Sequence, residues 1–164
     1  TMMRNDIYDF TRIGTFLERA DTTARILDVK YYVLLPSARA VGTSLDNVQW
    51  ETILRSVSAR GGFRMEYGAS GGPQEIADFL ILNRRMPRSL AFCIDKIEDN
   101  LGYLAKDRAT SLPTSEKVSS ICRELRAHTI EDIFSSGLHE FLQSTLGHLS
   151  GLSRQIEIDF RFYE

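Results

Sequence analysis

Charged residues recur every three or four positions between residues 18 and 28, where Glu18, Asp21, Arg25 and Asp28 follow one another. This spacing places them along one stripe of a helix. Counted from Leu17 at 100° per residue, Asp21 and Asp28 fall within about 40° of it, on the predicted core face, and Arg25 and Glu18 fall on its flank at about 80–100°. A buried carboxylate must be paired, hydrated or bound to a ligand, because burying it alone is costly. The stripe therefore predicts either a polar site or a buried ion-pair network.

The stripe holds more negative than positive charge. Arg25 lies four residues after Asp21 and three before Asp28, so its side chain can reach both. Three carboxylates against one guanidinium call for further cations from elsewhere in the fold. Arginine satisfies carboxylates with two parallel hydrogen bonds, so the first candidates are Arg84, Arg85 and Arg88, around Pro87. His139 and Glu140 form a second candidate set.

The remaining motifs do not support a metal site, a phosphate-binding loop or a reactive thiol. His128, His139 and His148 lack the spacing of a zinc protease helix or of a di-iron bundle site, so we expect no metal and no cofactor. The glycines at 68, 71 and 72 lack the Lys-Ser/Thr ending of a phosphate loop and predict a flexible turn. Cys93 and Cys122 fall at apolar-periodic positions and predict buried thiols.

Helical periodicity over nearly the whole chain predicts an all-α fold, a bundle of five or six helices with one long N-terminal helix. Proline, glycine and capping residues give the expected boundaries. The expected helices cover residues 6–35 (ended by Pro36), 47–67, 73–82, 87–104, 113–134 and 138–159. The tail from Ile156 alternates apolar and polar residues, but a helix to about Asp159 is favoured because no second strand exists to pair with it.

Length and composition indicate one all-helical domain over residues 1–164. The chain is 43% hydrophobic and 26% charged with a net charge of -2, and such a balance gives no field that recruits nucleic acid. Apolar runs such as Phe79–Leu82 are too short to span a bilayer, and no signal peptide is visible after Met2 and Met3. We therefore expect a cytoplasmic protein with no membrane or nucleic-acid partner.

The first long helix also carries a family resemblance. The segment Gly14–Tyr31 (GTFLERADTTARILDVKY) resembles the hallmark helix of the bacterial alpha-E domain family, and the stretches at 79–90 and 133–142 support the match. By this match Glu18, Arg19, Arg25 and Asp28 are expected to form the functional or structural centre. The helical wheel nevertheless places Arg19 away from the face of Asp21 and Asp28.

The resemblance also implies a longer protein and a class of partner enzyme. Alpha-E proteins are usually longer and look like two related halves, and this chain resembles the second, C-terminal half. Their association with circularly permuted ATP-grasp ligases and transglutaminase-like proteases implies a role in making or modifying a peptide or amide-linked product. A missing N-terminal half, or a second copy, is also expected to cover the back of the first helix, where Ile26, Val29 and Val33 form a second apolar side.

Three functions follow from these observations. The first and preferred one is a non-catalytic accessory domain that binds a partner enzyme, or binds an amino acid or peptide through its charged groups. The second is an enzyme that uses Glu18 or His139 for acid–base chemistry, which requires both side chains at one cavity. The third is a structural module in which the charges only specify packing.

Overall fold

The chain is all-helical in the part that the computed structural model describes, which is residues 5–32, 44–69, 71–106 and 110–161. These ranges contain eight helices and no strand, so the predicted all-α class is confirmed, although five or six helices were expected. The helices are α1 (Asp6–Tyr32), α2 (Ser44–Ser56), α3 (Arg60–Tyr67), α4 (Pro73–Ile81), α5 (Leu90–Leu104), α6 (Pro113–Ala127), α7 (Ile130–Ser136) and α8 (Leu138–Asp159). The predicted end of the first helix near Pro36 lies outside the described residues.

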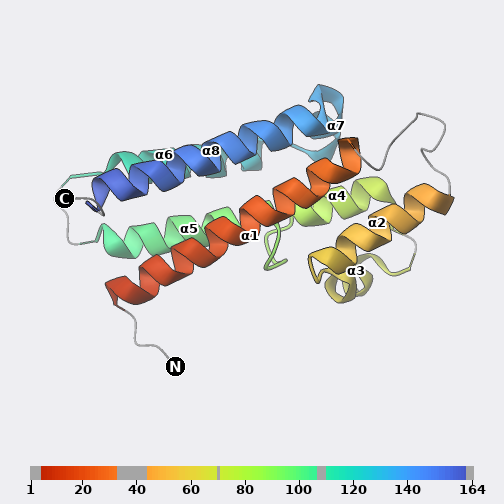
Figure 1. Cartoon of the computed structure of the whole chain (residues 1–164), viewed down its shortest axis with the longest axis horizontal. Helices are drawn as coiled ribbons and strands as arrows, with labels where there is room; N and C mark the ends of the chain where they lie inside the picture. Colours follow the sequence, from red (N-terminus) through yellow and green to blue (C-terminus); the bar gives the residue numbers. More distant parts are fainter. Residues whose placement is uncertain (1–4, 33–43, 70, 107–109, 162–164) are drawn as a thin grey trace.

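The four longer helices α1, α5, α6 and α8 form a closed bundle (Figure 1). Helix α1 packs against α5 and α8, and α6 packs against the same two helices from the other side. The short helices α2, α3, α4 and α7 gather at the end of the bundle where α1 finishes and α8 begins. Helices α1 and α8 run in opposite directions, so the start of α1 lies beside the end of α8.

The core explains which face of α1 points inward. Ile13, Phe16, Ala20, Ala24 and Leu27 are at most 2% exposed and recur every three or four residues. The centre of this face is about 60° from Leu17 on a helical wheel, on the side away from the charged stripe. Asp21 therefore lies outside the core face, contrary to the prediction, with a side chain that is 41% exposed. Asp28 lies at the edge of that face, and its side chain is only 15% exposed.

The predicted helix 47–67 is in fact two helices, α2 and α3. Helix α2 ends in a turn in which the Ser58 N–H donates to Arg55 O at 3.0 Å and the Ala59 N–H donates to Leu54 O at 2.8 Å. Ser58 adopts the left-handed conformation, with φ of 55°, that commonly ends helices. Val57 and Ala59 are buried on either side of it. No glycine or proline marks this turn, so the sequence pattern did not reveal it.

The predicted helix 113–134 is also divided, into α6 and α7. Thr129 begins α7 with reciprocal hydrogen bonds, since its Oγ1 accepts from Asp132 N at 3.2 Å and its N–H donates to Asp132 Oδ2 at 3.0 Å. The hydrogen bond from the Thr129 backbone N–H is the largest cause that holds the pKa of Asp132 below its ordinary value, and the Thr129 side chain adds to it. The capping signal was therefore present at residues 129–132 and was outweighed by the apolar periodicity.

Other boundaries agree more closely with the expectations. Helix α4 covers nearly the predicted residues, and α8 continues to Asp159, which confirms a helical rather than an extended tail. Helix α5 begins after Ser89 and not at Pro87, because Ser89 Oγ accepts from Phe92 N at 3.0 Å as its N-cap. Within the described ranges, no helix combines the length and apolarity needed to cross a membrane.

Candidate functional site

The charged stripe of α1 divides into a surface pair and a separate inter-helix contact. Arg25 Nε lies 2.8 Å from Asp21 Oδ2, and Arg25 Nη2 donates to Asp21 Oδ1 at 3.2 Å. Both side chains are exposed, at 65% and 41%. The hydrogen bond to Asp21 raises the pKa of Arg25, which keeps its guanidinium charged. Exposed pairs of this kind add little stability, so this pair contributes little to holding the fold.

Asp28 does not bind Arg25, contrary to the expectation that Arg25 reaches both carboxylates. Its Oδ1 lies 2.5 Å from His139 Nδ1, and its Oδ2 accepts from Gln143 Nε2 at 2.7 Å. The Asp28 and His139 side chains are only 15% and 19% exposed. Both partners belong to the first turns of α8, where the helix dipole favours a carboxylate. Asp28 therefore joins the C-terminal half of α1 to the N-terminal end of α8.

Glu18 and Arg19 point to different parts of the surface. Glu18 is exposed, and its Oε1 accepts from Thr22 Oγ1 at 2.9 Å. The Arg19 guanidinium instead lies 5.5 Å from the centre of the Phe16 ring. Of the two residues, only Glu18 lines a groove against α8.

This groove has a volume of about 510 Å³ and is open to solvent. Its α1 wall carries Glu18, Asp21 and Arg25, and its α8 wall carries Arg154 and Glu157. Among the described residues, neither Arg154 nor Glu157 makes a side-chain hydrogen bond or ion pair, and both can therefore bind a ligand. The remaining lining residues are Leu17, Leu146, Leu149, Ser150 and Ser153.

An apolar hollow of about 540 Å³ continues the charged section toward the start of α1. The two share Leu17, Ser153 and Glu157, so they form one surface feature, the α1–α8 groove. Phe10, Ile13, Gly14 and Ile156 complete the apolar section. A Cβ atom added to Gly14 would meet no atom within 4 Å, so the missing side chain leaves this section open. A bound molecule would thus meet charged groups at one end of the groove and an apolar surface at the other.

The arginines around Pro87 do not supply the expected cations. Arg84 Nη1 lies 2.7 Å from Asp95 Oδ2, and Arg85 Nη2 lies 3.7 Å from Glu66 Oε2. The backbone carbonyl of Arg88 accepts from Thr23 Oγ1 at 2.8 Å, and no contact between its side chain and a carboxylate of α1 is seen in the described residues. The expectation that these arginines neutralise the stripe is therefore wrong.

His139 and Glu140 also separate from Glu18. Helices α1 and α8 are antiparallel, so His139 meets α1 at Asp28, ten residues or about 15 Å along the helix from Glu18. Glu140 is exposed, and its side chain lies against Gly137 at the start of α8. The structure does not bring Glu18 and His139 to one cavity, which contradicts the acid–base arrangement that needs both.

The side of α1 that carries Ile26 and Val29 is partly covered within this chain, contrary to the prediction. Ile26 packs against the core, and Val29 is 49% exposed, while Val33 lies outside the described residues. Lys30 is fully buried; its Nζ donates to Gln49 Oε1 at 2.9 Å and lies 5.3 Å from the centre of the Trp50 ring. Helix α2 therefore covers part of the side that was expected to need another segment.

Metal and thiol chemistry find no clear place in the described structure. No group of three or more His, Cys, Asp or Glu side chains is gathered as a metal site requires in the described ranges. Cys93 and Cys122 are buried and unbridged, as expected. Burial raises the pKa of each thiol to about 12, so neither is a nucleophilic thiolate at neutral pH.

The fold and the groove define an all-helical domain with an open, mixed-charge groove between its first and last helices. Residues 1–160 match the alpha-E family model, which represents a predicted alpha-helical domain with a conserved ER motif. The chain belongs to this family. Glu18-Arg19 is the only Glu-Arg pair in the sequence, so the motif falls on α1 and Glu18 of the motif lines the groove. Neither a curated protein nor a solved structure matches the chain.

Proposed function

We propose that this alpha-E domain is an accessory binding domain whose α1–α8 groove holds the charged end of an amino acid or peptide. The observation that carries the proposal is the position of Glu18, of the ER motif, in one groove with Arg154 and Glu157. Carboxylates accept hydrogen bonds from an ammonium group, and a guanidinium binds a carboxylate with two donors. The groove therefore offers partners for both charges of a zwitterion.

The apolar section adds a preference for the rest of the molecule. It lies beyond Leu17 and is walled by Phe10, Ile13 and Ile156. Burial of an aliphatic side chain there stabilises the complex by about 25 cal/mol per Å² of apolar surface removed from water. The favoured ligand is a short peptide with a free charged end next to an apolar side chain.

The family resemblance supplies the setting of this proposal. A domain that holds an amino acid or peptide suits a partner that forms or breaks amide bonds. We therefore propose a circularly permuted ATP-grasp ligase or a transglutaminase-like protease as the partner. An ATP-dependent ligase works where ATP is abundant, so the proposal also places this chain in the cytoplasm.

The binding step is tested by titrating the chain with the dipeptide leucyl-leucine and following backbone amide NMR shifts. We expect saturable shifts at α1 and α8, and at least tenfold weaker binding of the N-acetylated and C-amidated dipeptides, because each lacks one charge. Glu18→Gln and Arg154→Gln should weaken binding of the free dipeptide similarly. Glu116→Gln and Arg123→Gln change exposed charges of α6 outside the groove and should have no effect.

Two results would count against the proposal. Equal binding of free and capped dipeptides would remove the role of the charges, and shifts confined to other helices would remove the groove. The partner step is tested separately, by co-purification of this chain with the ATP-grasp protein of the same genome. Absence of a complex would leave the groove proposal standing and would contradict the proposed setting.

A further inference from the structure

Four cations lie along the contact between α1 and α5, two helices that run side by side in Figure 1. Arg12 and Arg19 belong to α1, Lys96 belongs to α5, and Arg88 lies just before the start of α5. We propose that these four residues, the cationic strip, form a docking surface for an acidic helix of a partner protein. None of them lines the α1–α8 groove. The two residues of the ER motif then serve two surfaces, Glu18 the groove and Arg19 the strip.

An aromatic pair at the α1–α5 contact positions three of these cations. The rings of Phe16 and Phe92 meet edge to face, with their centroids 5.9 Å apart. The guanidiniums of Arg12 and Arg19 lie 4.6 Å and 5.5 Å from the centre of the Phe16 ring. Lys96 Nζ lies 5.5 Å from the centre of the Phe92 ring. Attraction between a cation and a ring face holds such groups in place, so the three charges gather at one position along the two helices.

Arg88 extends the strip toward the start of α5. Its backbone carbonyl accepts from Thr23 Oγ1 at 2.8 Å, one helical turn beyond Arg19 on α1. Burial raises the pKa of the Cys93 thiol to about 12, and the positive charges of Arg19 and Arg88 oppose this rise. Both guanidiniums therefore lie near the same thiol at the contact of the two helices.

Nearby carboxylates neutralise little of this positive charge. Asp99 Oδ2 lies 3.7 Å from Lys96 Nζ in a surface pair, and such pairs are weak. Asp9 is only 4% exposed, and Glu18 lines the groove on another side of α1. In the part of the chain that the structure describes, the guanidiniums of the three strip arginines form no ion pair and no hydrogen bond.

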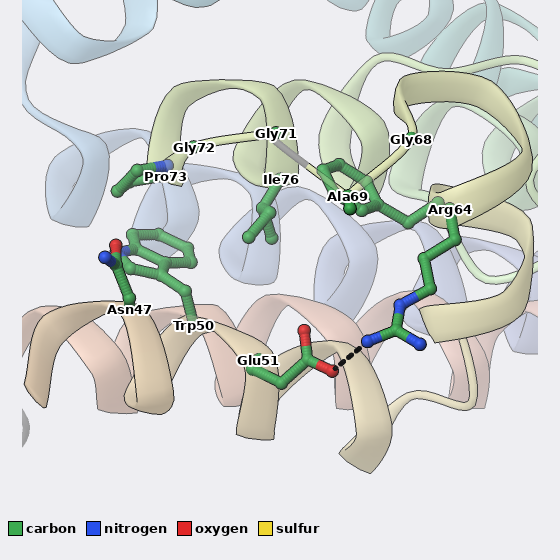
Figure 2. A pocket seen from close by; sticks show the side chains of 11 residues that line it. Asn47, Trp50, Glu51, Arg64, Gly68, Ala69, Gly71, Gly72, Pro73 and Ile76 are labelled. Atoms are coloured by element: carbon green, nitrogen blue, oxygen red, sulfur yellow. Dashed lines mark ion pairs between the residues drawn. The ribbon is translucent and has the colours of Figure 1, made fainter. Parts of the chain in front are cut away.

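Other arginines of the chain are bound by carboxylates. In the hollow that Figure 2 shows, Arg64 Nη2 lies 3.5 Å from Glu51 Oε1. Arg84 Nη1 lies 2.7 Å from Asp95 Oδ2. The strip differs from these clusters, because it gathers unpaired positive charge on a chain whose net charge is -2. Its charge is therefore complementary to an acidic surface, and such complementarity speeds encounter and fixes orientation.

The spacing of the strip fits a helix better than an extended chain. Arg12 and Arg19 are seven residues apart on α1, which corresponds to about 10.5 Å along the axis. Residues seven apart on a partner helix lie on one face at the same spacing of about 10.5 Å. Residues on one face of a strand repeat instead about every 6.8 Å. A helix that lies along the strip can therefore place one carboxylate at each of these arginines.

Two other kinds of ligand fit the strip less well. Single-stranded nucleic acid stacks its bases on accessible aromatic rings, whereas Phe16 is 1% exposed and Phe92 is partly buried. Small ligands bind in hollows, and neither the α1–α8 groove nor the hollow of Figure 2 is lined by a residue of the strip. An acidic protein helix needs neither an accessible ring nor a hollow.

The proposal is tested with an alanine-based helical peptide of about 20 residues that carries glutamate at every third or fourth position along one face. Backbone amide NMR of the chain should show saturable shifts at α1 and α5, with a Kd of about 1 mM or below at low salt. Three further probes are the same peptide with glutamine for glutamate, the glutamate peptide with two central prolines, and an oligothymidylate. Each should bind about tenfold more weakly or worse, because it lacks the charge, the helix or the protein chemistry.

Arg12→Gln and Arg19→Gln should each weaken binding of the glutamate peptide about fivefold or more, because each removes a charge-assisted contact. Arg19→Lys keeps a cation near the Phe16 ring and should recover much of the affinity, which separates loss of charge from loss of packing. Arg123→Gln, an exposed and unpaired arginine of the described α6, is the matched control and should bind like the unaltered chain. Thermal unfolding would check that every variant is folded.

Three results would overturn the proposal. Equal binding of the glutamate and glutamine peptides would remove the role of charge. Equal binding of the proline-containing peptide would remove the helix, and tighter binding of the oligothymidylate would replace the protein partner by a nucleic acid. An equal loss of affinity in Arg12→Gln and Arg123→Gln would show that the peptide responds to overall charge and not to the strip.

Discussion

His139 Nδ1 lies 2.5 Å from Asp28 Oδ1 across the contact of α1 with α8, although 111 residues separate the two in the sequence. Gln143 binds the second oxygen of the same carboxylate, one turn further along α8. Asp28 thus uses both its oxygens to hold one helix to the other. This arrangement gives it a structural role, in contrast to the exposed Glu18, Asp21 and Arg25.

Replacing Asp28 by alanine should therefore lower the free energy of unfolding by about 1–3 kcal/mol, because it removes two hydrogen bonds of a largely buried carboxylate. Urea unfolding followed by far-ultraviolet circular dichroism would measure the change. Asp21→Ala is the matched control, since the Asp21 side chain is 41% exposed and its loss should cost much less. Equal losses of unfolding free energy in the two variants would contradict the conclusion that Asp28 is structural while Asp21 is a surface residue.

The fold class was accessible from the sequence, but the inward face of α1 was not. The prediction centred the core face on Leu17, whereas Leu17 lies at the edge of that face with Phe10, and both residues line the groove. Helix α1 contacts α2, α5 and α8, so apolar residues extend over much of its circumference. Periodicity alone cannot locate the centre of so wide an apolar face.

The candidate site was predictable only on its α1 side. Glu18, Asp21 and Arg25 stood out because they interrupt an apolar pattern. Arg154 and Glu157 are three residues apart on a mixed-charge part of α8, and such charges usually mark a solvated face. Their importance depends on which helix packs beside them, and that information lies in the topology rather than in the local sequence.

The packing of Gly71 on the Phe63 ring gives a second prediction. Gly71→Ala should lower the free energy of unfolding by about 1–3 kcal/mol, because its Cβ would overlap the Phe63 ring at 2.3 Å. Gly102 is an exposed residue of α5, and a Cβ added there would meet no atom within 4 Å, so Gly102→Ala should raise stability by about 0.5–1 kcal/mol. Urea unfolding of both variants would check the opposite signs, and a neutral Gly71→Ala would contradict the tight contact.

The turn between α2 and α3 gives a third prediction. Ser58→Gly should raise the free energy of unfolding by about 0.5–1 kcal/mol, because glycine adopts φ of 55° without the strain of a side chain. Ser56→Gly, two residues earlier in helix α2, should instead lower it by about 0.5–1 kcal/mol. Thermal unfolding of the pair would measure both changes. A loss of stability in Ser58→Gly would show that the turn does not have this conformation.

The two cysteines give a prediction about pH. Burial raises the pKa of Cys93 and of Cys122 from the ordinary 9.0 to about 12. Both thiols therefore stay protonated in the folded chain at a pH where those of the unfolded chain ionise. Their contribution to stability is complete below pH 9.0 and is lost as the pH rises toward about 12.

Alkylation measures this difference directly, since only the thiolate reacts. With iodoacetamide at pH 8, intact-mass spectrometry should show almost no modification of the folded chain and two additions once guanidinium chloride unfolds it. Cys93→Ala and Cys122→Ala would assign each addition to its residue. Rapid alkylation of either thiol in the folded chain would contradict its burial and would make that cysteine a candidate nucleophile.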